Sequence, residues 1–223
     1  MTMMTRRGMF RSGVAVGAGS AVAWASGIGG APATWATSAT ADDPALRKPV
    51  LVGANPAVQL FADGSCTAYV SCWRVDWSTH GPGTAIVLWR PTGVSLHTDR
   101  PALGHWLADS FVRHFPELDG LPWTTPRLRP AEALVDIDLA RGMRARAGAL
   151  SVVTAGVLDR RTFATDDFTL GGVPHSLSLV LGPCATGEIR LGGQKLPGEI
   201  ERGGTPERPG SSAFVTEAEV WRT

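Results

Sequence analysis

Asp76 and His80 are the two side chains whose types and spacing best suit acid–base chemistry. Asp76 lies at the end of a run of alternating apolar and polar residues, and His80 opens the His80-Gly81-Pro82-Gly83 turn that follows. A carboxylate at this separation can orient the imidazole, and histidine titrates near neutral pH, so the pair is suited to act as a general base. We predict Asp76 and His80 as catalytic residues. The alternative is a hydrogen bond between solvated side chains at a turn.

Tryptophan is the second distinctive feature. Trp73 and Trp77 lie four residues apart in one run, which places them on the same face of a regular strand, and Trp89 and Trp106 follow in the next segments. Flat rings from a strand, its neighbour and a helix can line an apolar pocket. We therefore predict Trp73, Trp77, Trp89 and Trp106 as residues that bind a small apolar organic molecule. Ordinary core packing explains the same residues.

Other histidine clusters are weaker candidates. His105 and Asp109 lie four apart in an expected helix, so they share a face and can form a hydrogen bond. A metal site built from His80, His97 and His105 would lack the His-Glu-x-x-His spacing of helical zinc sites. We predict no metal and no cofactor.

The chain has three cysteines, Cys66, Cys72 and Cys184. In an extended run, Cys66 and Cys72 would lie about 20 Å apart, which is beyond the reach of a disulfide. A bridge would more plausibly join Cys184 to one of them and leave one free thiol. Such a thiol is more often a small buried apolar group than a nucleophile.

Several common catalytic motifs are absent from the sequence. It contains no Gly-x-Ser-x-Gly, no Walker loop and no Gly-x-Gly-x-x-Gly after a strand, so α/β-hydrolase, phosphate-binding and Rossmann functions are unsupported. We predict a cofactor-free acid–base enzyme, such as a cyclase, isomerase or lyase, by fold-level analogy with exported β-rich enzymes of specialised metabolism. The alternatives are a non-catalytic binding, accessory or inhibitor protein and, with less support, a secreted hydrolase that uses a Ser or Cys nucleophile.

The elements that would position these residues are mostly strands. Short runs of period-two alternation, separated by Gly, Pro and Asp, recur from Val50 to Trp221, and Asp63-Gly64 is a hairpin signal. One amphipathic helix is expected at about 100–115, with Thr98 or Asp99 as its cap and Pro101 in its first turn. Residues 192–212, with six Gly and three Pro, are expected to form a surface loop. About nine strands and one helix predict a mainly β fold, a single antiparallel β-barrel or sandwich.

Charge divides the chain into two parts. The whole chain has a net charge of +1, but Arg6, Arg7 and Arg11 lie in the first 41 residues, which hold no acidic residue. Removing these three charges leaves residues 42–223 at −2, which gives no general attraction to nucleic acid. We predict a single domain over residues 42–223 that has no nucleic-acid partner.

Residues 1–41 have the layout of a secretory signal, with a basic head, an uncharged middle and the small-residue tripeptide Ala39-Thr40-Ala41. The head, residues 5–11, reads Thr-Arg-Arg-Gly-Met-Phe-Arg and resembles the twin-arginine signal, Ser/Thr-Arg-Arg, any residue, two hydrophobic residues and a basic one. The resemblance implies that Arg6 and Arg7 direct a folded protein to the twin-arginine export machinery, with cleavage after Ala33, Ala36 or, preferably, Ala41. We predict a secreted protein, extracellular or in the cell wall. The middle is less apolar than the roughly 20-residue span a bilayer needs, so we predict no stable membrane insertion after cleavage.

Overall fold

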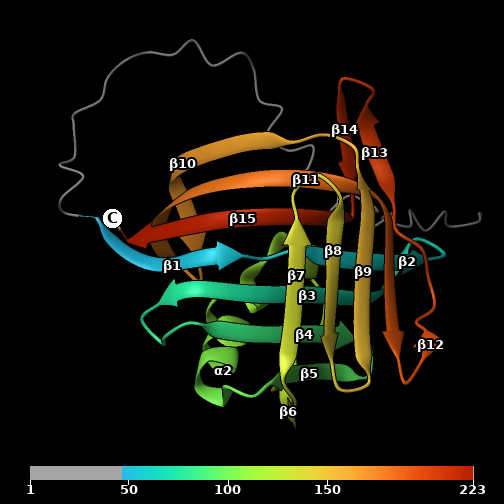
Figure 1. The fold of residues 1–223 in the computed structure, drawn as a ribbon, viewed down its shortest axis with the longest axis horizontal. Helices are drawn as coiled ribbons and strands as arrows, with labels where there is room; N and C mark the ends of the chain where they lie inside the picture. Colours follow the sequence, from blue (N-terminus) through green and yellow to red (C-terminus); the bar gives the residue numbers. More distant parts are fainter. Residues whose placement is uncertain (1–46, 223) are drawn as a thin grey trace, which may run out of the picture.

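The chain folds into two layers of β-sheet with a short helical segment on one side (Figure 1). The computed structural model describes residues 47–222, so the predicted leader at residues 5–41 lies outside the described residues. Strands contain 65% of the described residues and helices 9%, which confirms the prediction of a mainly β fold with one helix.

The first sheet contains most of the strands and supports the site. Its order is β6-β5-β4-β3-β1-β15-β11-β10, and β2 continues the line of β1 by pairing with β3 and β15. All these pairs are antiparallel except β5 with β6, which is parallel. The strands are β1 (Lys48–Ala54), β2 (Ala57–Ala62), β3 (Ser65–Ser78), β4 (Gly83–Arg90), β5 (Gly93–Thr98), β6 (Arg127–Pro130), β10 (Arg161–Leu170), β11 (Val173–Leu191) and β15 (Ala213–Arg222).

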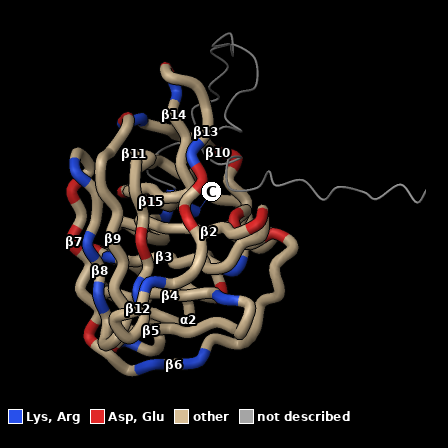
Figure 2. Tube along the Cα trace, turned by 90° about the vertical axis from the view of Figure 1, so that its right-hand side faces the viewer, with Lys and Arg blue, Asp and Glu red and all other residues tan. Residues whose placement is uncertain are grey.

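The second sheet crosses the first at a steep angle and is joined to it through β11. The first part of β11 pairs with β10 and β15, and from Cys184 onward β11 pairs with β9. In Figure 1, β7, β8 and β9 run across the strands of the first sheet. Figure 2 shows basic and acidic residues interspersed along these three strands. The second sheet comprises β7 (Ala133–Asp138), β8 (Gly142–Ala147), β9 (Leu150–Val157), the end of β11 and β12 (Gln194–Lys195).

The strand number and closure differ from the prediction. The described residues form fifteen strands, of which thirteen belong to one large mixed sheet rather than a closed barrel, and the other two pair with each other. Residues 192–212, expected as a loop, contain β12 and a hairpin of β13 (Arg202–Thr205) and β14 (Arg208–Ser211). These strands are short, β12 and β13 are fully exposed, and none of the three has the alternation of apolar residues from which strands are predicted.

Two apolar layers lie on opposite faces of the first sheet. Along β3, Tyr69 and Trp73 face the helical segment, while Val70 and Cys72 face the second sheet. We name these layers the helix-side core and the inter-sheet core. The helix-side core includes Tyr69, Trp73, Val87, Trp89, Leu103, Leu107 and Phe111. The inter-sheet core includes Val58, Leu60, Val70, Ile86, Leu88, Val152 and Ile189.

The helical segment is shorter and less regular than predicted. α2 (Pro101–Ser110) begins with Pro101 in its first turn, as expected, and two 3₁₀ turns follow, η2 (Val112–His114) and η3 (Pro116–Leu118). Thr98 Oγ1 accepts a hydrogen bond from the Arg100 amide, and no side chain caps the helix. Within residues 47–222, no helix is long and apolar enough to cross a bilayer.

Candidate functional site

An apolar pocket lies between the helical segment and the first sheet. Its floor is the face of β11 that carries Leu177, Leu179 and Leu181, because alternate residues of a strand face the same side. Neighbouring strands add Leu51 from β1 and Val220 from β15. Aromatic rings close the other sides, namely Trp73, Phe111, Phe115, Phe168 and Phe214. We name this site, with a volume of about 60 Å³, the inner pocket.

Glu117 is the titratable residue that lines the inner pocket. It lies in η3, its side chain is buried with 6% of the residue exposed, and its backbone carbonyl accepts a hydrogen bond of 2.8 Å from Gln59 Nε2. Its Oε2 atom has no hydrogen-bond partner among the described residues. Burial raises the pKa of Glu117 from 4.5 to about 7, and the nearby charge of Asp119 adds to the shift. A carboxyl group with such a pKa can both accept and donate a proton near neutral pH.

Three further buried polar atoms without a hydrogen-bond partner lie near Glu117, and of their residues Trp73 also lines the inner pocket. They belong to Gln59 Oε1, the Tyr69 hydroxyl and Trp73 Nε1, and Gln59 and Tyr69 face each other across β2 and β3. Burial, and then the charge of Glu117, raise the pKa of Tyr69 well above its ordinary value, so its hydroxyl stays protonated. Buried polar groups in folded proteins are nearly always hydrogen-bonded. Two of these exceptions, on Glu117 and Trp73, line the inner pocket, where a bound molecule would supply the missing partners.

Three of the four predicted tryptophans are at or near this region. Trp73 is 3% exposed and packs against Phe111 and Phe115, with ring centroids 5.7 and 6.1 Å apart. Trp89 belongs to the helix-side core, where its Nε1 donates a 2.9 Å hydrogen bond to the Pro122 carbonyl. Trp106 instead lines a second pocket of about 430 Å³, which we name the outer pocket.

Trp77 does not share a face with Trp73, because a bulge interrupts β3. Val52 of β1 pairs with Trp77 while Gly53 pairs with Val75, so Asp76 is an extra residue between them. The extra residue reverses the alternation beyond it. Trp77 is consequently 43% exposed.

The structure gives Asp76 and His80 different partners. Asp76 Oδ1 forms a 3.3 Å ion pair with Arg74, its side chain is 55% exposed, and Arg74 also contacts Glu217 at 3.0 Å. The exposed His80 ring stacks on Trp106 with centroids 4.5 Å apart, and its Nδ1 lies 3.2 Å from Thr79 Oγ1. His80 therefore contacts Trp106, which lines the outer pocket. Asp76 lines a different pocket, together with Arg74 and Glu217.

The remaining sequence candidates have structural roles or separate surroundings. Within residues 47–222, no group of three or more His, Cys, Asp or Glu side chains could hold a metal ion. His97 is buried and its Nε2 lies 3.1 Å from Ser95 Oγ. Asp109 lines the outer pocket, and its predicted partner His105 lies on the same helix.

All three cysteines carry free thiols. Cys72 and Cys184 are buried in the inter-sheet core, and Cys66 contacts the helix-side core. Burial raises the pKa of the Cys66, Cys72 and Cys184 thiols, which disfavours the reactive thiolate.

Sequence reasoning missed Glu117. The residue follows the expected helix in a Pro-rich connection, and its one local signal is a single acid in the apolar stretch Phe115-Pro116-Glu117-Leu118. An acid in such a stretch is unusual, because unpaired carboxyl groups are rarely fully buried. That signal indicates burial at most, and it does not reveal a pocket.

Comparisons of the chain with protein-family models, curated proteins and solved structures give no match. The function is therefore argued from the chemistry of the site.

Proposed function

We propose that the protein binds a small apolar organic molecule in the inner pocket and transfers a proton on it, as an isomerase, lyase or cyclase does. The observation that carries the proposal is the buried Glu117 carboxyl group. It has a pKa of about 7 and lines an apolar pocket that is rich in aromatic side chains. A strongly shifted titratable group in a pocket is a recognised sign of a catalytic site.

The chemistry is a proton transfer at a carbon next to a carbonyl group. The Glu117 carboxylate accepts the proton, and the electron pair of the broken C–H bond moves to the carbonyl oxygen. Trp73 Nε1–H, a buried donor without a partner among residues 47–222, can donate a hydrogen bond to that oxygen as its negative charge grows. Return of the proton from Glu117 to another carbon completes an isomerisation, and expulsion of a leaving group completes an elimination.

Asp76 and His80 were the acid–base pair predicted from the sequence, and in this proposal Glu117 acts as the acid and base instead. The Asp76 carboxyl group is exposed to water and ion-paired with Arg74, whereas the Glu117 carboxyl group is buried and its pKa is raised to about 7. Trp73 keeps its predicted binding role.

The test uses exchange of a carbon-bound proton, which needs no knowledge of the natural substrate. Butanone in D₂O exchanges its α-protons when a base removes them, and NMR follows the loss of signal. We expect the full chain to accelerate the exchange, with the rate rising around pH 7 as Glu117 ionises. Glu117→Gln should reduce the acceleration by about 10²-fold or more.

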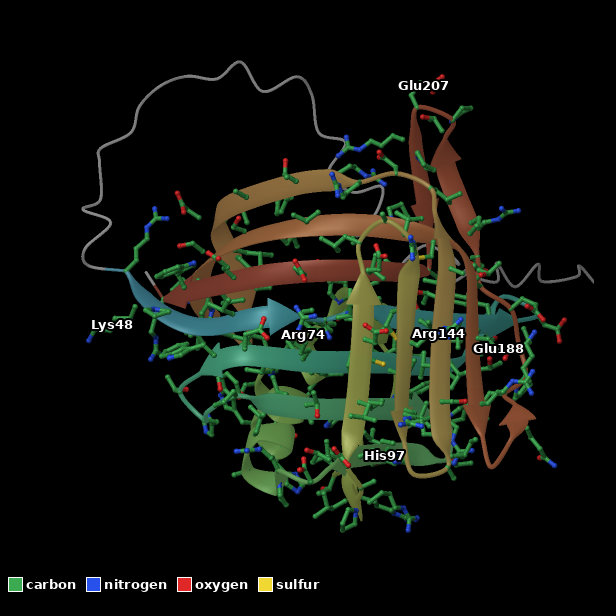
Figure 3. All side chains as sticks on the ribbon, viewed as in Figure 1. Lys48, Arg74, His97, Arg144, Glu188 and Glu207 are labelled. Carbon is green, nitrogen blue, oxygen red and sulfur yellow. The ribbon has the colours of Figure 1, made fainter. Side chains whose placement is uncertain are left out.

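Glu207→Gln is the matched control, because Glu207 is exposed in the turn of the β13–β14 hairpin (Figure 3). The control should retain the wild-type rate. Equal rates for wild type and Glu117→Gln would overturn the assignment of Glu117.

A non-catalytic binding protein is the second candidate, favoured by the nearly complete apolar lining of the inner pocket. Such a protein would hold the apolar molecule without moving a proton. If the chain binds an apolar molecule but does not accelerate the exchange of butanone protons above the background rate, the binding protein is favoured over the enzyme.

Export by the twin-arginine machinery is proposed from the sequence alone, on the resemblance of residues 5–11 to the signal. Replacing Arg6 and Arg7 by Lys should retain the protein inside the cell, because the signal needs both arginines. Immunoblots of the medium and of cell fractions measure the distribution. Undiminished secretion of the double variant would reject the proposed route.

A further inference from the structure

The outer pocket continues the inner pocket along the same face of the first sheet. On β11, Val173 and His175 line the outer pocket, and Leu177 and Leu179 line the inner one. These residues alternate along one strand and therefore share a face. On β15, Val220 lines the inner pocket and Arg222, two residues further along the strand, lines the outer pocket.

Phe111 lines both pockets, so its buried ring lies between them. Along β11, Leu179 and His175 are four positions apart, which corresponds to about 13 Å of strand. A molecule that occupied both pockets would have one end among the apolar side chains of the inner pocket and the other among the polar side chains of the outer pocket.

The polar side chains of the outer pocket include a row of basic side chains held in register. Lys48 of β1 pairs directly with Arg222 of β15, and Arg222 pairs on its other side with His175 of β11. All three line the outer pocket, and Figure 3 shows Lys48 at the start of β1. Like charges placed directly opposite each other on neighbouring strands destabilise a sheet.

The described residues do little to offset this repulsion. Lys48 and Arg222 form no ion pair within residues 47–222. The outer pocket is lined by one acidic residue, Asp109, and by a second histidine, His114. His175 is buried, and its Nδ1 donates a 2.9 Å hydrogen bond to the Val173 carbonyl, which fixes the ring. A negatively charged group in the outer pocket would remove the repulsion and bind to a guanidinium and an ammonium group together.

We propose that the outer pocket binds the carboxylate of an amphipathic molecule whose apolar end enters the inner pocket. This inference rests on the proposed function of the inner pocket and names the class of its substrate, a small organic acid with one apolar end. The carboxylate contacts Arg222 and Lys48, and the apolar chain passes Phe111 toward Glu117.

The test compares two probes that share an apolar chain and differ in the head group, octanoate and 1-octanol. Titration calorimetry on the full chain measures both affinities at pH 8 and low salt. We expect octanoate to bind about 10-fold or more tightly than 1-octanol, since hydrogen bonds to charged groups are among the strong ones. The double variant Lys48→Gln/Arg222→Gln should lose this preference and keep its affinity for 1-octanol.

Lys195→Gln/Arg202→Gln is the matched control, because it removes the same charges from exposed positions on β12 and β13. The control should keep the octanoate preference, and Arg222→Lys, which keeps the charge, should keep most of it. Equal affinity of the wild-type chain for the two probes, or a preference that survives Lys48→Gln/Arg222→Gln, would overturn the proposal.

Failure of this inference can be distinguished from failure of the acid–base function. If butanone exchange depends on Glu117 but octanoate shows no preference, the function of the inner pocket stands and the carboxylate site is wrong. If octanoate is preferred and the wild-type chain exchanges no butanone protons, the carboxylate site stands and the acid–base function is wrong.

Discussion

The helix-side core and the inter-sheet core use alternate residues of the same strands, yet they differ in chemistry. The inter-sheet core is built largely from small aliphatic side chains such as Val58, Leu60 and Ile189. The helix-side core collects the aromatic rings, and four buried polar atoms without a partner lie around it, on Gln59, Tyr69, Trp73 and Glu117. The candidate site thus lies on the aromatic face of the first sheet, and the aliphatic face packs against the second sheet.

This difference has a cost in stability. Each buried polar group without a hydrogen bond destabilises the folded chain by about 1–3 kcal/mol. Functional sites commonly hold such unfavourable groups, with stability supplied elsewhere in the fold. Shortening an apolar side chain should therefore cost more stability in the inter-sheet core than at the inner pocket, and replacing the buried Glu117 carboxyl group should raise stability.

The largest loss of stability is expected in the inter-sheet core. Leu60 is fully buried, so Leu60→Ala should lower the free energy of unfolding by about 3–5 kcal/mol through the cavity it leaves. Leu179 lines the inner pocket, where packing is already incomplete, so Leu179→Ala should cost about 2 kcal/mol. Urea denaturation of both variants measures the contrast. Equal losses would mean that the pocket wall is packed as tightly as the inter-sheet core.

A gain in stability is expected at Glu117. Its pKa is raised from 4.5 to about 7, so the folded chain holds this proton more tightly than the unfolded chain does. The stabilisation is complete below about pH 4.5 and is lost as the pH rises through 7. Glu117→Gln, which resembles the protonated form, should therefore be more stable than wild type at pH 8 by on the order of 3 kcal/mol, and equal to it at pH 4.

Urea denaturation from pH 4 to pH 8 measures this gain, with Glu207→Gln as a control that should follow the wild-type curve. Lower stability of Glu117→Gln than of wild type at pH 8 would show that the carboxylate is stabilised by a partner in the folded chain.

The smallest effect is expected at Trp77. Because the bulge at Asp76 turns this side chain outward, Trp77→Ala should change the free energy of unfolding by less than about 1 kcal/mol. A loss similar to that of Leu60→Ala would instead place Trp77 in the helix-side core, as uninterrupted alternation predicts. The same denaturation measurements decide between the two.

Local patterns in the sequence were sufficient for the class of fold. Alternation in runs such as Ser65–Ser78, and three- and four-residue spacing after Pro101, correctly predicted strands and one helix. Such patterns record which residues face inward within one element, and this is a local property. The charge separation and the leader motif are also local, so the sequence alone carries the export proposal.

The site depended on contacts that no local pattern contains. Gln59 meets the backbone of Glu117 across 58 residues of sequence, and the pairing of Lys48 with Arg222 joins the two ends of the described chain. The bulge at Asp76 and the change of partner along β11 likewise arise from pairing between distant strands. Desolvation depends on which groups surround a side chain, so the pKa of Glu117 and the position of the pocket were decided by the tertiary structure.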